Sequence, residues 1–267
     1  MELPIPLPLS LRELTEEVDK RLSRVTADLN EYGYDPYGLS PSYARSLLIF
    51  GTILYRYYFR VETQGIERVP SGRVLVIGNH AGNTIPIDGG MVGLSLFLEL
   101  EPPRMARAMA EFYLPQIPWW SELIHRVGAV VGTPENCTQL LEREEAILVF
   151  PEGHRGFIKP YSKAYQLQRF GTGFVRLALQ TRTPIVPVGI VGTEEQSPGL
   201  FDSGPLARMI GAPAFPITWT FPWLGPLGYL LPLPVKLRLH FGDPILFEGE
   251  ANEPDAAIEE KVERVKD

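Results

Sequence analysis

His80 and Asp88 are a pair of residues whose types and spacing suit acid–base chemistry. A neutral imidazole can take up a proton near neutral pH, and a nearby carboxylate can fix its tautomer and stabilise the cation that forms. Pro86 lies between the two residues and disfavours an unbroken helix, so we expect a loop to fold Asp88 back towards His80. The alternative is that Asp88 only caps a helix that begins at Gly89.

Three polar segments each follow a short apolar run that is typical of a buried strand. The apolar runs are 73–77, 146–150 and 183–191, and the polar segments are 80–88, 152–155 and 192–193. Helical patterns are found at 90–100, 114–127, 137–143 and 170–180, with a late strand at 236–241 and a terminal helix at 255–266. The alternation predicts an α/β fold with a mostly parallel sheet flanked by helices. Because the carboxyl ends of parallel strands meet at one edge of a sheet, the polar segments are expected to converge there.

The first 60 residues are predicted to form an N-terminal helical segment ahead of an α/β domain at 61–267. Ser10 and Glu13 stand at capping-box spacing, and an amphipathic pattern continues from there to about residue 30. A second helix is predicted at 42–60. Its apolar stretch is too short to span a bilayer, so we expect it to lie in a membrane interface or to pack on the core.

The ordered motifs resemble those of the glycerolipid acyltransferase superfamily, of the lysophosphatidic acid acyltransferase type. Gly-Asn-His at 78–80 with the later Asp88 comes first, Phe-Pro-Glu-Gly-His-Arg follows at 150–155, and Val-Pro stands at 186–187. The similarity spans roughly residues 60–195. It implies a fold like that of the glycerol-phosphate acyltransferases.

The resemblance also implies a reaction. The donor is expected to be a fatty acyl thioester, acyl-CoA or acyl carrier protein, and no metal or other cofactor is expected. His80 is expected to deprotonate the acceptor hydroxyl, which attacks the thioester carbonyl directly, while Asp88 orients the imidazole. The expected acceptor is a lysophospholipid or glycerol phosphate.

The implied acceptor-binding residues lie beside these motifs, because a carboxylate can accept from a glycerol hydroxyl and a guanidinium can hold a phosphate. They are Asn79, Glu152, Gly153, Arg155, Lys159 and Lys163. The family often places an Arg shortly after a Gly in its middle motif, whereas the segment 128–134 here offers Thr and Pro. Lys159, Lys163 or Arg169 could take the place of that cation.

The interval between His80 and Asp88 suggests a second kind of acceptor. Seven residues separate them, more than the family usually has. The segments 85–88 and 161–174 look similar to a branch of the superfamily that acylates mono- or diacylglycerol. A neutral acceptor is therefore the alternative to a phosphorylated one.

Two other classes of function remain as alternatives. A lipid esterase or thioesterase could use His80 with a serine, but the sequence contains no Gly-x-Ser-x-Gly motif. A lipid-binding module without catalytic activity is the other alternative. Acyl-CoA consumption with and without a lysolipid separates these alternatives from acyl transfer.

Composition narrows the class of partner. The net charge of −7 argues against a nucleic-acid-binding protein. Between residues 146 and 193, however, six Lys or Arg residues stand against one acidic residue, which could attract an anionic cofactor, a lipid phosphate or a membrane surface. Cys137 is the single cysteine, so no internal disulfide can form and a reducing compartment is favoured. No basic leader followed by an apolar core opens the chain, and we expect no secretory signal.

The segment 209–235 carries no charged residue but contains six prolines. Prolines at this density exclude a regular membrane-spanning helix. We expect an apolar flap that faces a membrane or covers the acyl chain, with Trp219, Trp223 and Tyr229 suited to a bilayer interface. The alternative is a proline-rich loop packed on the core. Together these features predict a protein at the cytoplasmic side of a membrane, peripheral or monotopic.

Overall fold

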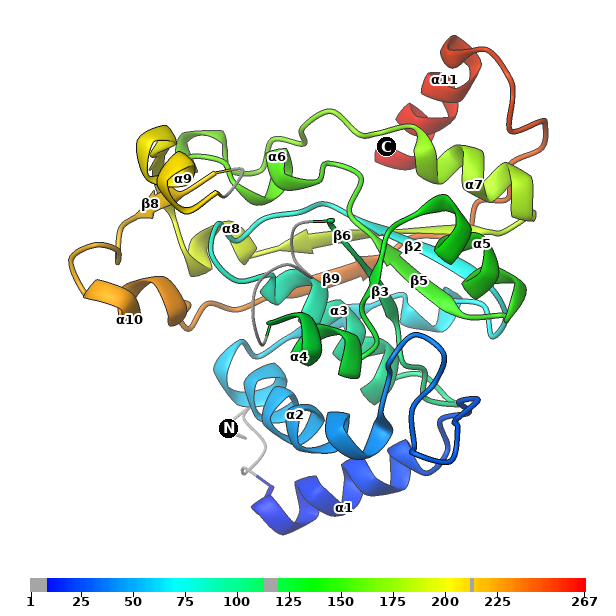
Figure 1. Cartoon of the computed structure of the whole chain (residues 1–267), viewed down its shortest axis with the longest axis horizontal. Coiled ribbons are helices and arrows are strands. Elements are labelled where there is room, and N and C mark those ends of the chain that lie inside the picture. The colour runs from blue at the N-terminus through cyan, green and yellow to red at the C-terminus, as the bar shows by residue number, and fades with distance from the viewer. Residues whose placement is uncertain (1–8, 113–119, 212–213) are drawn as a thin grey trace, which may run out of the picture.

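A seven-stranded sheet forms the centre of the protein in the computed structural model, which describes residues 9–112, 120–211 and 214–267 (Figure 1). The strand order is β1-β9-β6-β2-β5-β3-β4, and each neighbouring pair is parallel except β6 with β9. The strands are β1 (Glu62–Gln64), β2 (Val74–Gly78), β3 (Arg107–Ala110), β4 (Val130–Val131), β5 (Ala146–Val149), β6 (Ile185–Val191) and β9 (Arg238–Phe241). This mostly parallel sheet confirms the predicted fold class.

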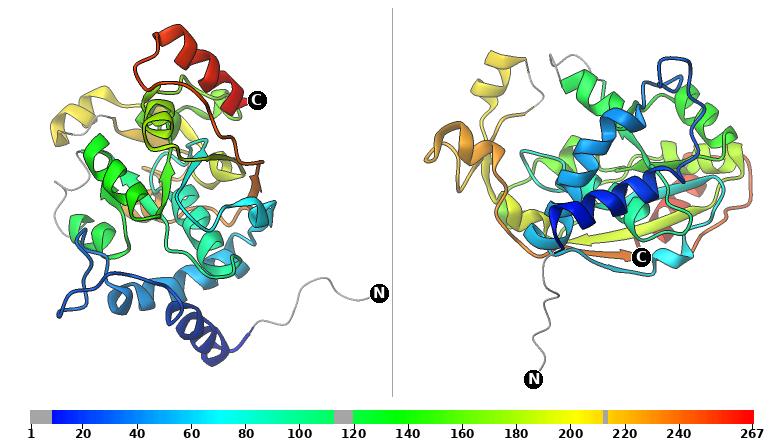
Figure 2. Two further views of the ribbon diagram at one scale, coloured as in Figure 1. Left: turned by 90° about the vertical axis from the view of Figure 1, so that its right-hand side faces the viewer. Right: turned by 90° about the horizontal axis from the view of Figure 1, so that it is seen from below.

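Helices cover both faces of the sheet. They are α1 (Leu11–Leu22), α2 (Pro41–Ile53), α3 (Ile87–Leu98), α4 (Trp120–Arg126), α5 (Pro134–Glu142), α6 (His154–Phe157), α7 (Gly173–Thr181), α8 (Thr193–Gln196), α9 (Gly204–Ile210), α10 (Gly225–Leu230) and α11 (Asp255–Lys266). Figure 2 shows α1 and α2 on one side of the molecule and α11 on the other. The predicted N-terminal helices are thus present.

The side chains of β2 alternate between two apolar clusters, as expected for a strand buried on both faces. Leu75 and Ile77 pack with residues of α5, α7 and α11. Val74 and Val76 pack on the other face with residues of α3. The resulting core holds β2 rigidly at the centre of the sheet, and the residues that leave its carboxyl end are fixed with it.

The predicted boundaries hold best where a strand or helix is long and strongly patterned. The terminal helix has the predicted bounds, and the strands β2, β5, β6 and β9 lie within or next to their predicted ranges. The capping box of Ser10 and Glu13 is present at α1, but α1 ends at Leu22 rather than near residue 30. There the amide groups of Arg24 and Val25 bond to carbonyls three residues back, which tightens the chain into turns. The predicted helix at 114–127 is observed only as α4, and residues 113–119 lie outside the described part.

The second N-terminal helix is split into two kinds of helix. The α-helix α2 passes into a π-helical turn, η1 (Leu54–Tyr58). Tyr55 on this turn and Val18 on α1 belong to the same apolar cluster as Met91 and Phe97 on α3. The N-terminal helices therefore pack on the helix that follows the His80 loop.

The apolar segment 209–235 contains one short strand and a short helix. Its strand β8 (Pro216–Thr218) pairs with β7 (Gly199–Asp202) in a separate two-stranded sheet, and α10 follows. Figure 1 places α9, β8 and α10 together on the side of the molecule where α6 and α8 lie. Within the described residues, no helix has the length and apolarity needed to cross a membrane.

Candidate active site

The three predicted polar segments lie side by side at the carboxyl edge of the sheet. His80 follows β2, Glu152 follows β5 and Thr193 follows β6, and β2 pairs with both of the other strands. Parallel pairing places all three strand ends on one edge. The structure therefore brings together segments that are far apart in the sequence.

His80 and Asp88 form a close pair at this edge. The Nδ1 atom of His80 lies 2.6 Å from Oδ2 of Asp88. Asp88 is fully buried in the first turn of α3, and the loop containing Pro86 brings it back as predicted. The carboxylate also accepts hydrogen bonds from the backbone N–H groups of Ala81 at 2.9 Å and of Gly89 at 2.8 Å. Asp88 therefore contacts both the imidazole and the backbone around the helix start.

Two phenylalanine rings stack on the imidazole of His80. The ring centroid of Phe150 lies 4.3 Å away at an interplanar angle of 15°, and that of Phe157 lies 4.7 Å away at 29°. Two rings at these distances and angles require one on each face of the imidazole. The imidazole is thereby held in one plane, with Nδ1 directed at Asp88. Among the described residues, none is hydrogen-bonded to the remaining nitrogen, Nε2, which can therefore meet a substrate.

Glu152 is buried and both of its carboxylate oxygens are engaged by backbone groups. Oε1 accepts from the N–H of His80 at 2.8 Å, and Oε2 accepts from the N–H of Gln168 at 2.6 Å. A side chain at Gly156 would collide with Glu152, since an added Cβ would lie 2.5 Å from the glutamate Cβ. In this placement the carboxylate positions the chain at His80 and Gln168, and the acceptor-binding role implied by the resemblance stays a prediction.

Both polar groups of the Asn79 side chain are hydrogen-bonded to the backbone. Its Nδ2 donates to the carbonyl of Ile190 at 3.0 Å, and its Oδ1 accepts from the N–H of Ile190 at 2.7 Å. The two hydrogen bonds join the end of β2 to β6. Asn79 therefore fixes the strand end from which His80 projects, and its amide is occupied in doing so.

Lys159 lies in a closed ion pair. Its side chain is 6% exposed, and Nζ lies 3.2 Å from Oε1 of the equally buried Glu194 and donates to the carbonyl of Gln166 at 3.3 Å. Arg169 pairs with Glu259 on α11. Lys159 is therefore not free to replace the missing phosphate-binding residue of the middle motif, whereas Arg169, whose side chain is 77% exposed, is held only by a surface ion pair.

Arg155 and Lys163 are the exposed cations of the predicted set. Among the described residues, no hydrogen bond or ion pair occupies the guanidinium of Arg155. Gly153 precedes it with φ of +58°, a backbone conformation that favours glycine. Arg155 is therefore exposed on α6, three positions after the buried Glu152.

Glu111 was not predicted and belongs to the same edge. It follows β3 directly, and its Oε1 accepts from the N–H of His154 at 2.9 Å. The rule that identified the other residues would have found it, but the short strand β3 was not recognised.

Cys137 lies in a different environment on α5, where burial raises the pKa of its thiol to about 11. A nucleophilic thiolate at this position is therefore not expected at neutral pH.

Metal ligands do not gather in the described part of the chain. No three side chains of His, Cys, Asp or Glu lie close enough to one another there to hold a metal ion.

The sequence is similar to one family model and to proteins from several organisms. A family model described as "Acyltransferase" matches residues 60–191. An uncharacterized protein of Mycobacterium tuberculosis strain H37Rv is 41% identical over 226 residues, which cover 83% of this chain and 62% of that protein. A mouse protein named "DGAT1/2-independent enzyme synthesizing storage lipids" is 26% identical over 77% of this chain and 57% of its own length. The chain thus spans less than two thirds of the length of these relatives.

Two further similarities involve proteins named for phosphorylated glycerolipids. A 1-acyl-sn-glycerol-3-phosphate acyltransferase of Limnanthes alba is 29% identical over 55% of this chain and 50% of its own length. The crystal structure of the 1-acyl-sn-glycerophosphate acyltransferase PlsC from Thermotoga maritima matches with a TM-score of 0.51 and 20% identity. The match covers 83% of this chain and 76% of the PlsC chain. At that identity the structural likeness concerns the fold.

Proposed function

The chain belongs to the glycerolipid acyltransferase superfamily, and we propose that it transfers a fatty acyl group from an acyl thioester to a lipid hydroxyl. The donor in this proposal is acyl-CoA or acyl carrier protein, and the acceptor is a lysophospholipid or glycerol phosphate. The observation that carries the proposal is the 2.6 Å contact between Nδ1 of His80 and the buried carboxylate of Asp88. It suits general-base catalysis because the carboxylate holds one imidazole tautomer and stabilises the imidazolium.

In the proposed reaction, Nε2 of His80 accepts the proton of the acceptor hydroxyl as the oxygen attacks the thioester carbonyl. A new C–O bond forms, the carbonyl becomes a tetrahedral oxyanion, and its collapse breaks the C–S bond. The proton held by the imidazole then passes to the departing thiolate. Asp88 stays ionised throughout and stabilises the cation. Donor, acceptor and proton therefore balance without any other reactant.

The remaining buried groups are proposed to position His80. Phe150 and Phe157 hold the plane of its ring, and Glu152 and Asn79 hold the backbone on either side of the strand end. A base acts efficiently only within hydrogen-bonding reach of its proton, so small displacements reduce the rate.

The acceptor head group is proposed to contact Arg155. Its guanidinium is exposed beside the buried Glu152 and can form paired hydrogen bonds with a phosphate. A neutral acceptor, mono- or diacylglycerol, is the second candidate. Two observations favour it: the ion pair of Lys159 with Glu194 leaves fewer cations for a phosphate, and the mouse relative is named for storage-lipid synthesis.

A membrane surface is proposed as the partner that presents the lipid. The segment 209–235 exposes large apolar side chains and carries no charge. They are Met209, Trp219, Trp223, Leu224, Leu227, Leu230 and Leu231. A patch of this size marks an interaction surface, and tryptophan suits the headgroup region of a bilayer. We infer a peripheral or monotopic protein at the cytoplasmic side of a membrane.

The proposed activity is tested with the full chain, radiolabelled acyl-CoA and a panel of phosphorylated and neutral acceptors, with lipid products separated and identified. Labelled product from one acceptor class is expected, and His80→Ala is expected to abolish it. Thioester cleavage without an acceptor would identify a thioesterase instead. Donor binding without turnover would identify a binding module, and transfer that survives His80→Ala would exclude the proposed base.

A further inference from the structure

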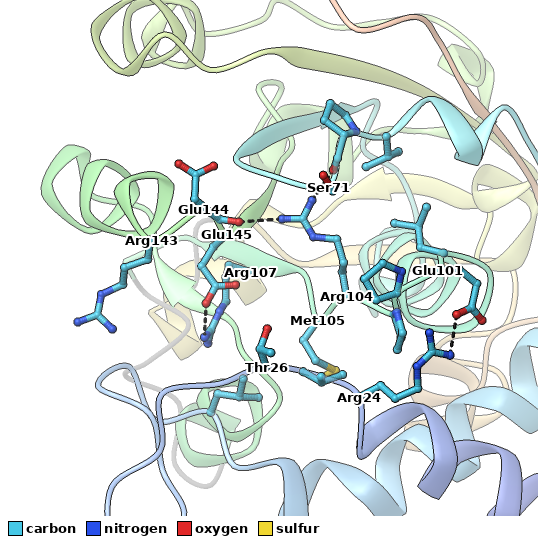
Figure 3. Close-up of a pocket in the computed structure, with 17 residues that line it drawn as sticks. Arg24, Thr26, Ser71, Glu101, Arg104, Met105, Arg107, Arg143, Glu144 and Glu145 are labelled. Atoms are coloured by element: carbon cyan, nitrogen blue, oxygen red, sulfur yellow. Dashed lines mark hydrogen bonds and ion pairs between the residues drawn. The ribbon is translucent and has the colours of Figure 1, made fainter.

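A cavity of about 420 Å³ lies at the edge of the sheet opposite the candidate active site (Figure 3). Its walls include the residues that precede β2, β3 and β5, together with the segment 24–26 after α1. His80 leaves the carboxyl end of β2, whereas this cavity lies at the amino end. The two sites are therefore separated by the length of the strand.

Arginine side chains provide the charge that lines this cavity. Arg24, Arg104, Arg107 and Arg143 are set against three glutamates. Each glutamate is already paired: Glu101 with Arg24, Glu144 with Arg73 and Glu145 with Arg107. Three of the arginines are paired as well, Arg143 with Asp28 at 3.6 Å, so Arg104 is the lining arginine without a carboxylate partner among the described residues.

Arg107 retains unused hydrogen-bond donors. Its side chain is 2% exposed, and Nη2 donates to Asp35 and Glu145. Among the described residues, however, Nε and Nη1 have no hydrogen-bond partner. A buried N–H group without a partner is unfavourable, so an acceptor that reached this guanidinium would stabilise the structure.

Arg104 is hydrogen-bonded to backbone carbonyls and not to carboxylates. Its guanidinium donates to the backbone carbonyls of Pro70 at 2.6 Å and Glu144 at 3.0 Å. No carboxylate of the described residues lies within ion-pair distance of it. Burial lowers the pKa of the Arg104 guanidinium, which reflects the cost of keeping this charge away from water. An anion in the cavity would offset that cost.

We propose that this cavity binds a phosphate group, with Arg104 and Arg107 as its donors. The lining groups that could still form hydrogen bonds are N–H donors of arginine side chains. A phosphate has several acceptor oxygens and can bind more than one arginine. The volume leaves room for a small organic group beside the phosphate, and Val25, Leu100 and Met105 supply apolar wall for it. Both free phosphate and a glycerol phosphate head group meet this description.

The test is thermal unfolding of the full chain in sodium phosphate against sodium chloride of equal ionic strength, without acyl donor. We expect a saturable rise in Tm of roughly 5–10 °C when free phosphate is about 100-fold above its Kd. Arg104→Gln is expected to remove most of the rise, while Arg155→Gln, at the opposite edge, keeps it. A rise lost in Arg155→Gln but kept in Arg104→Gln, or no rise at all, would overturn the proposal.

A second measurement does not depend on the folding of a variant. Crystals of the unaltered chain are soaked in arsenate, a phosphate mimic, and the arsenic is located by anomalous scattering. A site within hydrogen-bonding distance of Arg107 Nη1 or Nε is expected, and arsenic found only elsewhere would contradict the proposal. Titration of Arg155→Gln, which lacks the proposed acceptor contact at the opposite edge, with glycerol 3-phosphate then distinguishes the sources. Binding at least tenfold tighter than that of inorganic phosphate indicates the organic head group, and equal affinity indicates free phosphate.

Discussion

The backbone N–H of His80 donates a 2.8 Å hydrogen bond to Oε1 of Glu152, a residue 72 positions later in the chain. The other oxygen of the same carboxylate accepts from the N–H of Gln168 at 2.6 Å. Glu152 thus ties the end of β2 to the turn after β5 and to the segment that leads into α7. The position of the proposed base depends on this buried carboxylate.

Replacement of Glu152 by glutamine tests whether the carboxylate positions His80 or binds the acceptor. The amide has one acceptor oxygen, so its NH₂ group must face one of the two N–H donors. We expect kcat to fall by up to about 100-fold with an unchanged KM for the acceptor. The free energy of unfolding should fall by about 1–3 kcal/mol. The matched control is Glu142→Gln, an exposed glutamate on α5. A raised KM with unchanged kcat would assign Glu152 to acceptor binding instead.

Asp88→Asn tests the proposed role of the buried carboxylate beside His80. The amide cannot stabilise an imidazolium as a carboxylate does, so we expect kcat to fall by roughly 10²–10⁴-fold. His80→Ala should lose at least as much, and the double variant should lose little more, because the two residues act as a unit. Asp243→Asn, whose side chain is 86% exposed, is the control. Additive losses in the double variant would show that the two residues act separately.

The central strands and the proximity of His80 and Asp88 could be predicted because their signals are local. The apolar runs of β2, β5 and β6 each end in a polar motif, and Asp88 lies within eight positions of His80. The strands β1 and β4 contain only three and two residues, too few for a pattern to be recognised. The strand β3 begins with Arg107, which is buried only because Asp35 and Glu145 neutralise it.

The sequence could not predict which polar side chains are already paired, because their partners are distant in the chain. Asn79 bonds to Ile190 and Lys159 pairs with Glu194, partners that lie far along the chain. A motif shows which residue types stand together, whereas tertiary packing decides whether a polar side chain is free for a substrate. Arg155 and Lys159 therefore look equivalent in the sequence and differ in the structure.

Lys159→Met tests this difference between the two cations. The change leaves Glu194 buried without its partner, which we expect to cost about 3–5 kcal/mol in the free energy of unfolding. A double variant with Glu194→Leu should recover much of that stability. Arg155→Gln, in contrast, should leave stability unchanged and raise the KM for a phosphorylated acceptor roughly 10–100-fold, the loss of one charged hydrogen bond. A raised KM in the stabilised double variant would return Lys159 to the acceptor site.

The attachment of α1 should weaken at acid pH. The Arg56 guanidinium, hydrogen-bonded to Glu17 at 2.7 Å, lowers the pKa of that carboxyl below 4.5 in the folded protein. A lowered carboxyl pKa contributes stability that is present above the unfolded pKa and is lost as pH falls through the folded value. The free energy of unfolding of the unaltered chain should therefore exceed that of Arg56→Met by about 0.2–1 kcal/mol at pH 7, and the difference should shrink as the pH falls below 4.5. Urea unfolding across that pH range measures it, and a constant difference would mean that only packing is lost.

The last prediction concerns the exposed apolar side chains of segment 209–235. It distinguishes a segment that docks on a membrane from one that covers the acyl chain. Leu227 and Leu246 are each 63% exposed, the first on α10 and the second between β9 and α11. Burial of a leucine in lipid contributes about 1.5–3 kcal/mol, so Leu227→Ser should weaken binding to phospholipid vesicles roughly tenfold or more. Leu246→Ser should leave it unchanged.

The same vesicles also report on tryptophan. Trp223 is 73% exposed, and its fluorescence should shift to the blue when vesicles are added if it enters the interface. Neither serine variant should change Tm, because both side chains already face solvent. If the segment instead covers the acyl chain, vesicle binding will survive Leu227→Ser, and the KM for a long-chain acyl donor will rise while that for a short-chain donor does not. Equal loss of vesicle binding in the two variants would show that the membrane contact is not confined to this segment.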